Sequence, residues 1–167
     1  MKYTISVLVE NQPGVLSKVA GLFSRRGFNI DSLAVGITED PAVSRITIVV
    51  NGDEYVMEQV EKQLNKLIPV IKVKTLDTTG EFYSCELSLV KINAHNQQRA
   101  ELMKIAELMQ ARIVDVSPTS MTFQVADSVE RTDNLIALLK PYGIREIVRT
   151  GTVAIEKGAS VTRKKGS

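Results

Sequence analysis

Residue types that suit the binding of a small zwitterion gather in residues 10–16, which read ENQPGVL. Pro13 and Gly14 come directly before a periodic apolar segment, so the first N–H groups of a helix would be unpaired there and partly positive. A carboxylate placed at such a helix end finds hydrogen-bond donors. Gly14 lets a ligand approach the backbone, and the Asn11 amide both donates and accepts. The alternative is a plain turn in which Asn11 satisfies the helix end.

The sequence contains few candidate residues for side-chain catalysis or metal binding. The single histidine, His95, stands in a polar stretch and is typical of a solvated loop. The single cysteine, Cys85, sits between apolar strand positions and is typical of a small buried side chain, and one cysteine excludes an internal disulfide. No glycine-rich nucleotide loop and no tight acidic cluster is present. We therefore expect no catalytic residue, no metal site and no cofactor in this chain.

Charge and hydropathy restrict the partners. The net charge is +2, and the basic excess lies in a tail, residues 159–167, that we expect to be solvated and disordered. The expected strand at residues 43–51 carries no aromatic residue for base stacking, which argues against nucleic acid. No apolar run approaches the ~20 residues of a membrane span, and no signal peptide is evident. We expect a cytoplasmic protein without nucleic-acid or membrane partners.

Hydrophobic periodicity alternates between about two and 3.6 along the first half of the chain. We expect strands at residues 3–9, 29–38, 43–51 and 70–76, and helices at residues 15–26 and 53–66. Ile5, Val7 and Val9 share one face of the first strand, and Gly27 follows the first helix as a C-terminal signal. The predicted order is βαββαβ.

The second half repeats this order after a polar linker at residues 77–80. We expect strands at residues 83–92, 112–116, 121–126 and 144–155, and helices at residues 97–109 and 129–140. The predicted fold class is α+β, with two tandem βαββαβ ferredoxin-like sandwiches. The expected domains are residues 1–76, which would bind an effector and dimerise, and residues 81–158.

Each such sandwich leaves one face of its sheet without helices. We expect the bare face of the first sheet to carry apolar residues such as Leu33, Val35 and Ile37, or their neighbours. A sheet that is apolar on both faces must be covered on both. A partner chain is the simplest cover, and we expect that partner to be a second copy, which makes a homodimer.

Two long motifs resemble one known family. The runs NQPGVLS at 11–17 and GLFSRRGFNIDSL at 21–33 resemble the opening of an ACT domain, and SRITI at 44–48 continues the match. The second half matches through RIVDV at 112–116 and above all LKPYGIREIVRTG at 139–151. Together they resemble the small regulatory subunits of acetolactate synthase (acetohydroxyacid synthase) over about residues 3–158.

The resemblance implies a non-catalytic subunit that binds valine at an ACT dimer interface. It further implies a large catalytic subunit, carrying thiamine diphosphate, magnesium and FAD, that this chain activates and subjects to feedback inhibition in branched-chain amino-acid biosynthesis. Carried over by position, the ligand would meet residues of the first β–α junction from one chain and residues 29–30 from the other. These are Asn11, Pro13, Gly14, Val15 and Leu16, with Asn29 and Ile30.

Two other interpretations remain at this point. A free-standing tandem ACT sensor of amino acids would need a second ligand loop at the second β–α junction. That junction, residues 92–98, reads INAHNQQ and has neither glycine nor proline. A small enzyme acting alone is disfavoured because no catalytic constellation is present.

Overall fold

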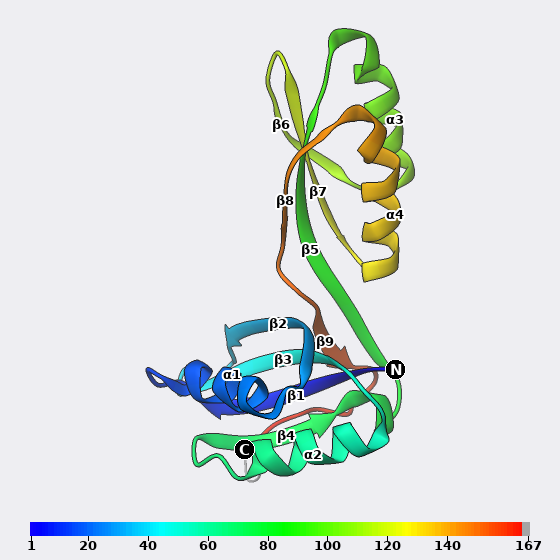
Figure 1. The fold of residues 1–167 in the computed structure, drawn as a ribbon. Coiled ribbons are helices and arrows are strands. Elements are labelled where there is room, and N and C mark those ends of the chain that lie inside the picture. The colour runs from blue at the N-terminus through cyan, green and yellow to red at the C-terminus, as the bar shows by residue number, and fades with distance from the viewer. Residues whose placement is uncertain (165–167) are drawn as a thin grey trace. The chain divides into compact units, whose positions relative to one another are not determined.

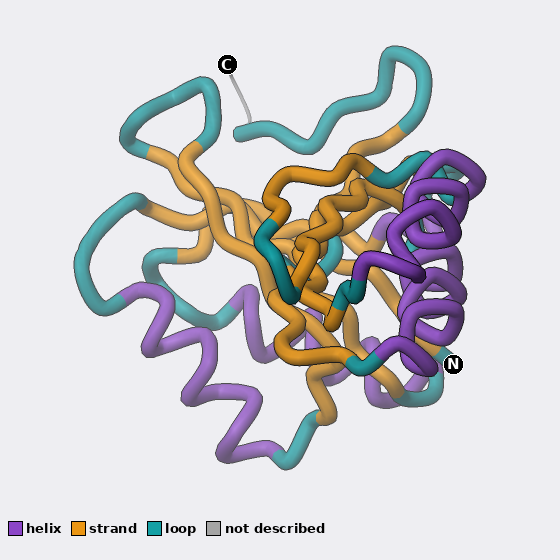
Figure 2. Tube along the Cα trace, turned by 90° about the horizontal axis from the view of Figure 1, so that it is seen from above, coloured by secondary structure: helices purple, strands orange, loops and turns teal. Residues whose placement is uncertain are grey.

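The computed structural model describes residues 1–164, and these form two compact units (Figure 1). The first unit comprises Met1–Tyr83 and the chain from Thr152 onward, and the second comprises Ser84–Gly151. The second unit is thus inserted between two parts of the first. Figure 2 traces the helices, strands and loops along the Cα path. The expected second domain, residues 81–158, therefore has a different C-terminal limit from the compact unit, because the chain rejoins the first unit at Thr152.

The first unit has the predicted βαββαβ order. Its elements are β1 (Lys2–Glu10), α1 (Val15–Arg26), β2 (Asn29–Ile37), β3 (Val43–Asn51), α2 (Glu54–Asn65), β4 (Val70–Thr75) and the short 3₁₀ helix η1 (Leu76–Thr78). The strands form an antiparallel sheet in the order β2-β3-β1-β4. Strand β2 is therefore an edge of the sheet, while β1 and β3 are its two central strands.

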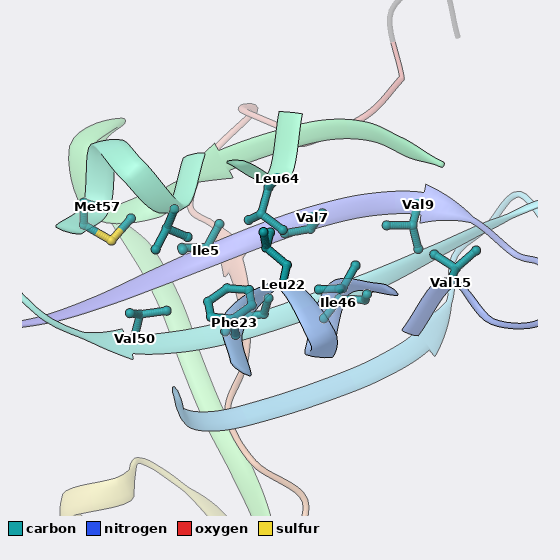
Figure 3. Close-up of a cluster of buried hydrophobic side chains, with 13 residues drawn as sticks. Ile5, Val7, Val9, Val15, Leu22, Phe23, Ile46, Val50, Met57 and Leu64 are labelled. Carbon is teal, nitrogen blue, oxygen red and sulfur yellow. The ribbon is translucent and has the colours of Figure 1, made fainter. Parts of the chain in front are cut away.

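The core of the first unit lies between the sheet and its two helices (Figure 3). Alternate residues of β1 point into it, and Ile5, Val7 and Val9 are at most 2% exposed, as their spacing predicts. The apolar stripes of α1 and α2 supply the opposite wall, including Leu22, Phe23, Met57 and Leu64. Burial of these two periodic faces against one sheet is what fixes the layered arrangement.

Local sequence signals set the ends of both helices. The Asp53 side chain accepts a hydrogen bond of 2.8 Å from the backbone N–H of Val56 and caps the start of α2. Gly27 ends α1 in the left-handed conformation with a φ of 67°, and its N–H reaches the Ser24 carbonyl at 3.3 Å. The direction of α1 brings the chain back along β1 to the start of β2.

The helix-free face of the first sheet is covered differently from our expectation. Residues directly opposite in an antiparallel pair point to the same face, and Val35 stands opposite Ile46 of the core. Leu33, Val35 and Ile37 therefore belong to the helix side, and their prediction for the bare face is wrong. Side chains that do point to the helix-free face, including Ser6, Leu8 and Val49, are buried all the same.

Residues 152–163, here called the C-terminal strap, cover that face from within the first unit. The backbone N–H of Thr152 donates to Ser32 Oγ at 3.3 Å. Arg45 Nη2 donates to the Thr162 carbonyl at 2.9 Å, and Lys74 Nζ lies 2.7 Å from Glu156 Oε1. The chain's own strap thus supplies cover that we had expected from a partner chain.

The expected tail, residues 159–167, lies partly in the strap and partly outside the described residues, which end at 164. Within the described part, Thr162 is only 8% exposed and its Oγ donates to Glu156 Oε1 at 2.9 Å. This differs from a solvated tail, because Arg45 of β3 donates to the Thr162 carbonyl and Thr162 in turn bonds to Glu156.

The second unit repeats the architecture. Its elements are β5 (Phe82–Asn93), η2 (Asn96–Gln98), α3 (Arg99–Leu108), β6 (Arg112–Val116), β7 (Ser120–Asp127), α4 (Val129–Leu139), η3 (Lys140–Tyr142) and β8 (Ile144–Arg149). The strands pair in the order β6-β7-β5-β8. Its core comprises Val90, Ile92, Ala94, Leu102, Ala106, Met121, Phe123, Val125, Leu135 and Leu139. The α+β class with two ferredoxin-like units is confirmed.

The last predicted strand is two strands in the structure. Instead of one strand over 144–155, β8 ends at Arg149 and a short β9 (Val153–Glu156) follows. Gly151 lies between them with a φ of 84°, a conformation that interrupts an extended chain. Strand β9 pairs with β5, whose first residues, Phe82 and Tyr83, belong to the first unit.

A charge network joins β5, α4 and β8 in the second unit. Glu86 is 4% exposed, and the Arg149 guanidinium pairs with it and with Asp133, whose Oδ1 lies 2.8 Å from Nη1. The hydrogen bond to Glu86 raises the pKa of Arg149. Arg149 belongs to the LKPYGIREIVRTG motif at 139–151. This network is a structural role for the arginine at that position.

Candidate functional site

The β1–α1 loop presents an open helix end. Gly14 precedes α1 with a φ of 84°, and no side chain of the described residues caps the helix there. A Cβ built on Gly14 would have no heavy atom within 4 Å, so the space beside the backbone is free. The Val15 N–H donates to the Gln12 carbonyl at 3.4 Å, and the N–H groups that follow it in the first turn, together with the helix dipole, make this end suited to a carboxylate.

Asn11 is held in a fixed orientation beside that helix end. Its backbone N–H donates to the Ala42 carbonyl and its Nδ2 to the Pro41 carbonyl, both at 2.9 Å. These bonds tie the β1–α1 loop to the turn between β2 and β3. The loop is therefore a defined surface rather than a plain flexible turn.

The apolar residues of the loop divide between core and surface. Val15 is 6% exposed and packs in the core, whereas Leu16 is 45% exposed. Pro13 is exposed at the tip of the loop. Leu16 is thus the side chain of this loop that is free to contact an aliphatic ligand group, and Val15 acts by holding the loop against the core.

Asn29 and Ile30 lie at the other end of the same sheet. Asn29 stands opposite Asn51, which in turn stands opposite Lys2 at the start of β1. Asn11 follows the end of β1, and a nine-residue strand spans roughly 27 Å at ~3.3 Å per residue. The structure brings residues 11–16 together but does not bring Asn29 to them within one chain.

Strand β2, which begins at Asn29, has an open outer edge. No strand of residues 1–164 pairs with that edge. Val35 and Ile37 are 47% and 67% exposed, and the single charged residue of β2, Asp31, lies 3.1 Å from Lys2 Nζ. Edge strands of monomers are normally protected by charge, proline or a bulge, and here a bulge lies between Ile30 and Ser32 only. The remaining edge is suited to pairing with another strand.

The corresponding junction of the second unit is built differently. The 3₁₀ helix η2 occupies it, and the Ala94 N–H donates to the Thr119 carbonyl at 3.0 Å. The Arg99 guanidinium donates to the Ser117 carbonyl and lies across the junction. No open α-helix end like that at Gly14 results.

The side chains considered for catalysis do not meet in the structure. His95 is exposed in its loop and Cys85 is partly buried in β5. Within residues 1–164 no three His, Cys, Asp or Glu side chains are grouped as metal ligands would be. No helix of that part of the chain is long and apolar enough to cross a membrane.

Sequence reasoning missed one polar cluster, formed by Arg45, Lys74, Glu156 and Thr162. The hydrogen bond from Lys74 lowers the pKa of the Glu156 carboxyl, against the opposing effect of its burial, and Thr162 and Arg45 act in the same direction. The members are up to 117 positions apart in the chain, and no local pattern links them. Only the return of the chain to the first unit brings them together.

Comparison with known proteins assigns both halves of the chain. Residues 5–72 match a family model described as an "AHAS small subunit-like ACT domain", and residues 85–158 match "Small subunit of acetolactate synthase". A probable acetolactate synthase small subunit of Archaeoglobus fulgidus is 51% identical over 95% of this chain and 98% of its own length. The acetolactate synthase isozyme 3 small subunit of Salmonella typhimurium is 43% identical over 98% and 100%.

A solved structure agrees with these matches. The acetolactate synthase small subunit of Thermotoga maritima superposes with a TM-score of 0.89 at 37% identity. The alignment covers 96% of this chain and 99% of that one. Similarity therefore extends over both units and the strap.

Proposed function

Since the chain belongs to the family of acetolactate synthase small subunits and begins with an ACT domain, we propose that it binds valine between two copies of itself and regulates a large catalytic subunit. The single observation that supports this most is the placement of the site residues. The Asn11–Leu16 loop and Asn29 lie at opposite ends of a sheet whose edge strand is open.

A twofold axis through the middle of β2 would join these two ends. In an antiparallel pair, the first residue of one strand lies beside the last residue of the other. The end of β2, Ile37, leads into the turn whose Pro41 and Ala42 carbonyls hold Asn11. Asn29 of one chain would therefore come close to Asn11 of its partner, and two equivalent sites would form.

The chemistry of each half suits a different part of valine. The open N-terminus of α1 after Gly14 receives the carboxylate, and the amides of Asn11 and the partner's Asn29 hold the ammonium and the remaining carboxylate oxygen. Leu16 and the partner's Ile30 enclose the isopropyl group, whose burial stabilises the complex by roughly 1.5–3 kcal/mol. Glycine has no such group to bury, so the site selects valine over glycine.

Regulation follows from a ligand that touches two chains. Valine favours the dimer arrangement that closes its site, and only a difference in affinity between arrangements can alter a bound partner. The partner in this proposal is the acetolactate synthase large subunit, which carries the thiamine diphosphate, magnesium and FAD. The small subunit contributes activation and valine sensitivity.

Reconstitution tests the proposal. The purified chain is added to a purified large subunit, and acetolactate formation from pyruvate is measured as valine is titrated. We expect the chain to raise the rate and valine to lower it again, while the chain alone forms no acetolactate. A rate that is unchanged by the chain, or a stimulated rate that valine does not affect, would contradict the proposal.

A further inference from the structure

A cavity of about 230 Å³ lies on the helix-free face of the first sheet. Ser6 of β1, Arg45 of β3 and Leu76 form its floor, and the C-terminal strap forms its roof through residues 154–156 and 161–163. None of the residues discussed above for valine lines it. The cavity is thus a separate feature of the first unit, enclosed within one chain.

Two buried polar atoms at this cavity have no hydrogen-bond partner among residues 1–164. Ser6 is 2% exposed and its Oγ makes no hydrogen bond within that part of the chain, and the Nε of Arg45 is likewise buried and unpaired there. Unpaired buried donors are rare in folded proteins and need an explanation. The two side chains share one face of neighbouring strands, since Arg45 stands opposite Leu8, two residues from Ser6. Both side chains therefore line the same side of the cavity.

The unpaired polar atoms and the apolar lining of the cavity indicate which kind of molecule would fit. A guanidinium N–H and a hydroxyl both donate, which suits a carboxylate oxygen. The neighbouring acid, Glu156, is already engaged by Lys74 and Thr162. Leu76, Ile155 and Val161 add apolar surface for a short aliphatic chain.

The size of the cavity limits what can occupy it. A water molecule takes up ~30 Å³ of liquid, so a single bridging water would leave most of the space unfilled. Pockets for drug-sized ligands begin near ~300 Å³, which makes a nucleotide too large. At ~30 Å³ for each water-sized group, the cavity has room for a molecule of roughly seven or eight non-hydrogen atoms.

We propose that this cavity is a second small-molecule site, which binds a short aliphatic carboxylate through Ser6 Oγ and Arg45 Nε beneath the C-terminal strap. The carboxylate lies between these two donors, and its aliphatic part packs on Leu76 and the strap. An amino acid and the corresponding acid without an amino group share this chemistry. The two ligand classes differ in one contact at the rim of the cavity. There the exposed Glu39 can pair with the ammonium group of an amino acid, which the other acid lacks. Because the roof is the strap, an occupant holds the strap on the sheet.

Nuclear magnetic resonance of the full-length protein tests the site directly. The probes are 3-methylbutanoate and valine, and the signals are the Arg45 Nε–H and the Ser6 backbone amide. Both probes are titrated against the Gly14→Asp variant, in which the proposed valine site is blocked. We expect saturable shifts of both signals in this variant, and tighter binding of valine would assign the amino acid as the ligand class. An absence of saturable shifts with either probe would overturn the proposal and leave the valine site at the dimer interface unaffected.

A conservative substitution provides the specificity control. Ser6→Ala removes a hydroxyl that has no partner among the described residues, so thermal stability should hardly change. It should weaken probe binding roughly tenfold, since a charge-assisted hydrogen bond is lost. Lys72→Gln removes a cation from the same sheet face outside the cavity and should leave binding unchanged. Equal affinity of Ser6→Ala and wild type would show that the probe does not occupy this cavity.

Discussion

Asn11 and Asn29 lie at opposite ends of the first sheet of one chain. Asn11 follows the last residue of β1, whereas Asn29 is level with the start of β1, on the other side of β3. Residues that serve one ligand must be brought within a few ångströms of it. The separation of these two asparagines, together with the open edge of β2, is the reason to place the valine site between two chains.

Gly14→Asp should weaken valine inhibition and leave stimulation of the large subunit intact. The new carboxylate would stand at the helix end that receives the ligand carboxylate, so the valine concentration for half-inhibition should rise roughly tenfold or more. Gly158→Asp is a matched control, because Gly158 also has a positive φ, 73°, and open space around its Cβ position. If both variants lose valine sensitivity equally, backbone strain rather than the site is responsible.

Val35→Lys should convert the dimer to a monomer. Val35 is exposed on the open edge strand, and a charge there opposes strand pairing. Sedimentation velocity should show a smaller species, and valine binding should fall with it. Val114→Lys is the control, since Val114 is comparably exposed, at 44%, on β6, the edge strand of the second sheet. A Val35→Lys protein that remains dimeric would argue for a different interface.

The Lys74–Glu156 pair should make the strap sensitive to acid. Lys74 lowers the pKa of Glu156 from its ordinary value of 4.5, so the pair stabilises the fold fully above that pH. This contribution disappears as the pH falls through the lowered pKa. Lys74→Met should therefore reduce the free energy of unfolding by ~1.5–3 kcal/mol near neutral pH and flatten its decline in acid. Urea unfolding across the acid range measures both effects.

A matched double variant distinguishes the loss of the ion pair from nonspecific destabilisation of the fold. Lys74→Met with Glu156→Gln removes the uncompensated buried charge as well, and should regain part of the lost stability. Equal stability of the single and double variants, with an unchanged acid profile, would show that the pair does not hold the strap.

Removal of the second unit should be tolerated only if the strap is kept. A chain that ends at Gly80 lacks the strap and leaves Leu8 and Val49 uncovered, with each buried apolar side chain worth ~1.5–3 kcal/mol. A variant in which residues 84–151 are replaced by a short Gly/Ser linker keeps it. The linked variant should melt at a higher temperature and still bind valine by calorimetry. Equal melting temperatures of the truncated and the linked variant would contradict a structural role for the strap.

Sequence patterns predicted the elements of both units because each has local signals. The β1 alternation at Ile5, Val7 and Val9 and the helix stop at Gly27 lead directly to the observed strand and helix. The same holds for the β1–α1 loop, whose Pro13 and Gly14 predict an open helix end. These features depend on neighbours in the chain.

What the patterns missed depends on distant contacts. Residues 144–155 are apolar enough for one strand, and only the positive φ of Gly151 shows that the chain turns there to rejoin the first unit. The strap covers the sheet through Arg45–Thr162 and Lys74–Glu156, pairs without any shared sequence motif. The sheet face to which Val35 points likewise follows from its pairing with Ile46. The sequence of one strand alone does not show that register.

A mixture of two valine-resistant variants tests the two-chain site most directly. Asn29→Ala removes a hydrogen bond from one half of each site and Gly14→Asp blocks the other half, so each variant alone should resist valine. In a dimer of one chain of each kind, one site carries both changes and the other carries none. After the variants are unfolded together and refolded, about half of the dimers are mixed, and reconstituted enzyme should regain a valine-sensitive fraction of its activity. A mixture as resistant as either variant alone would contradict a site shared between chains.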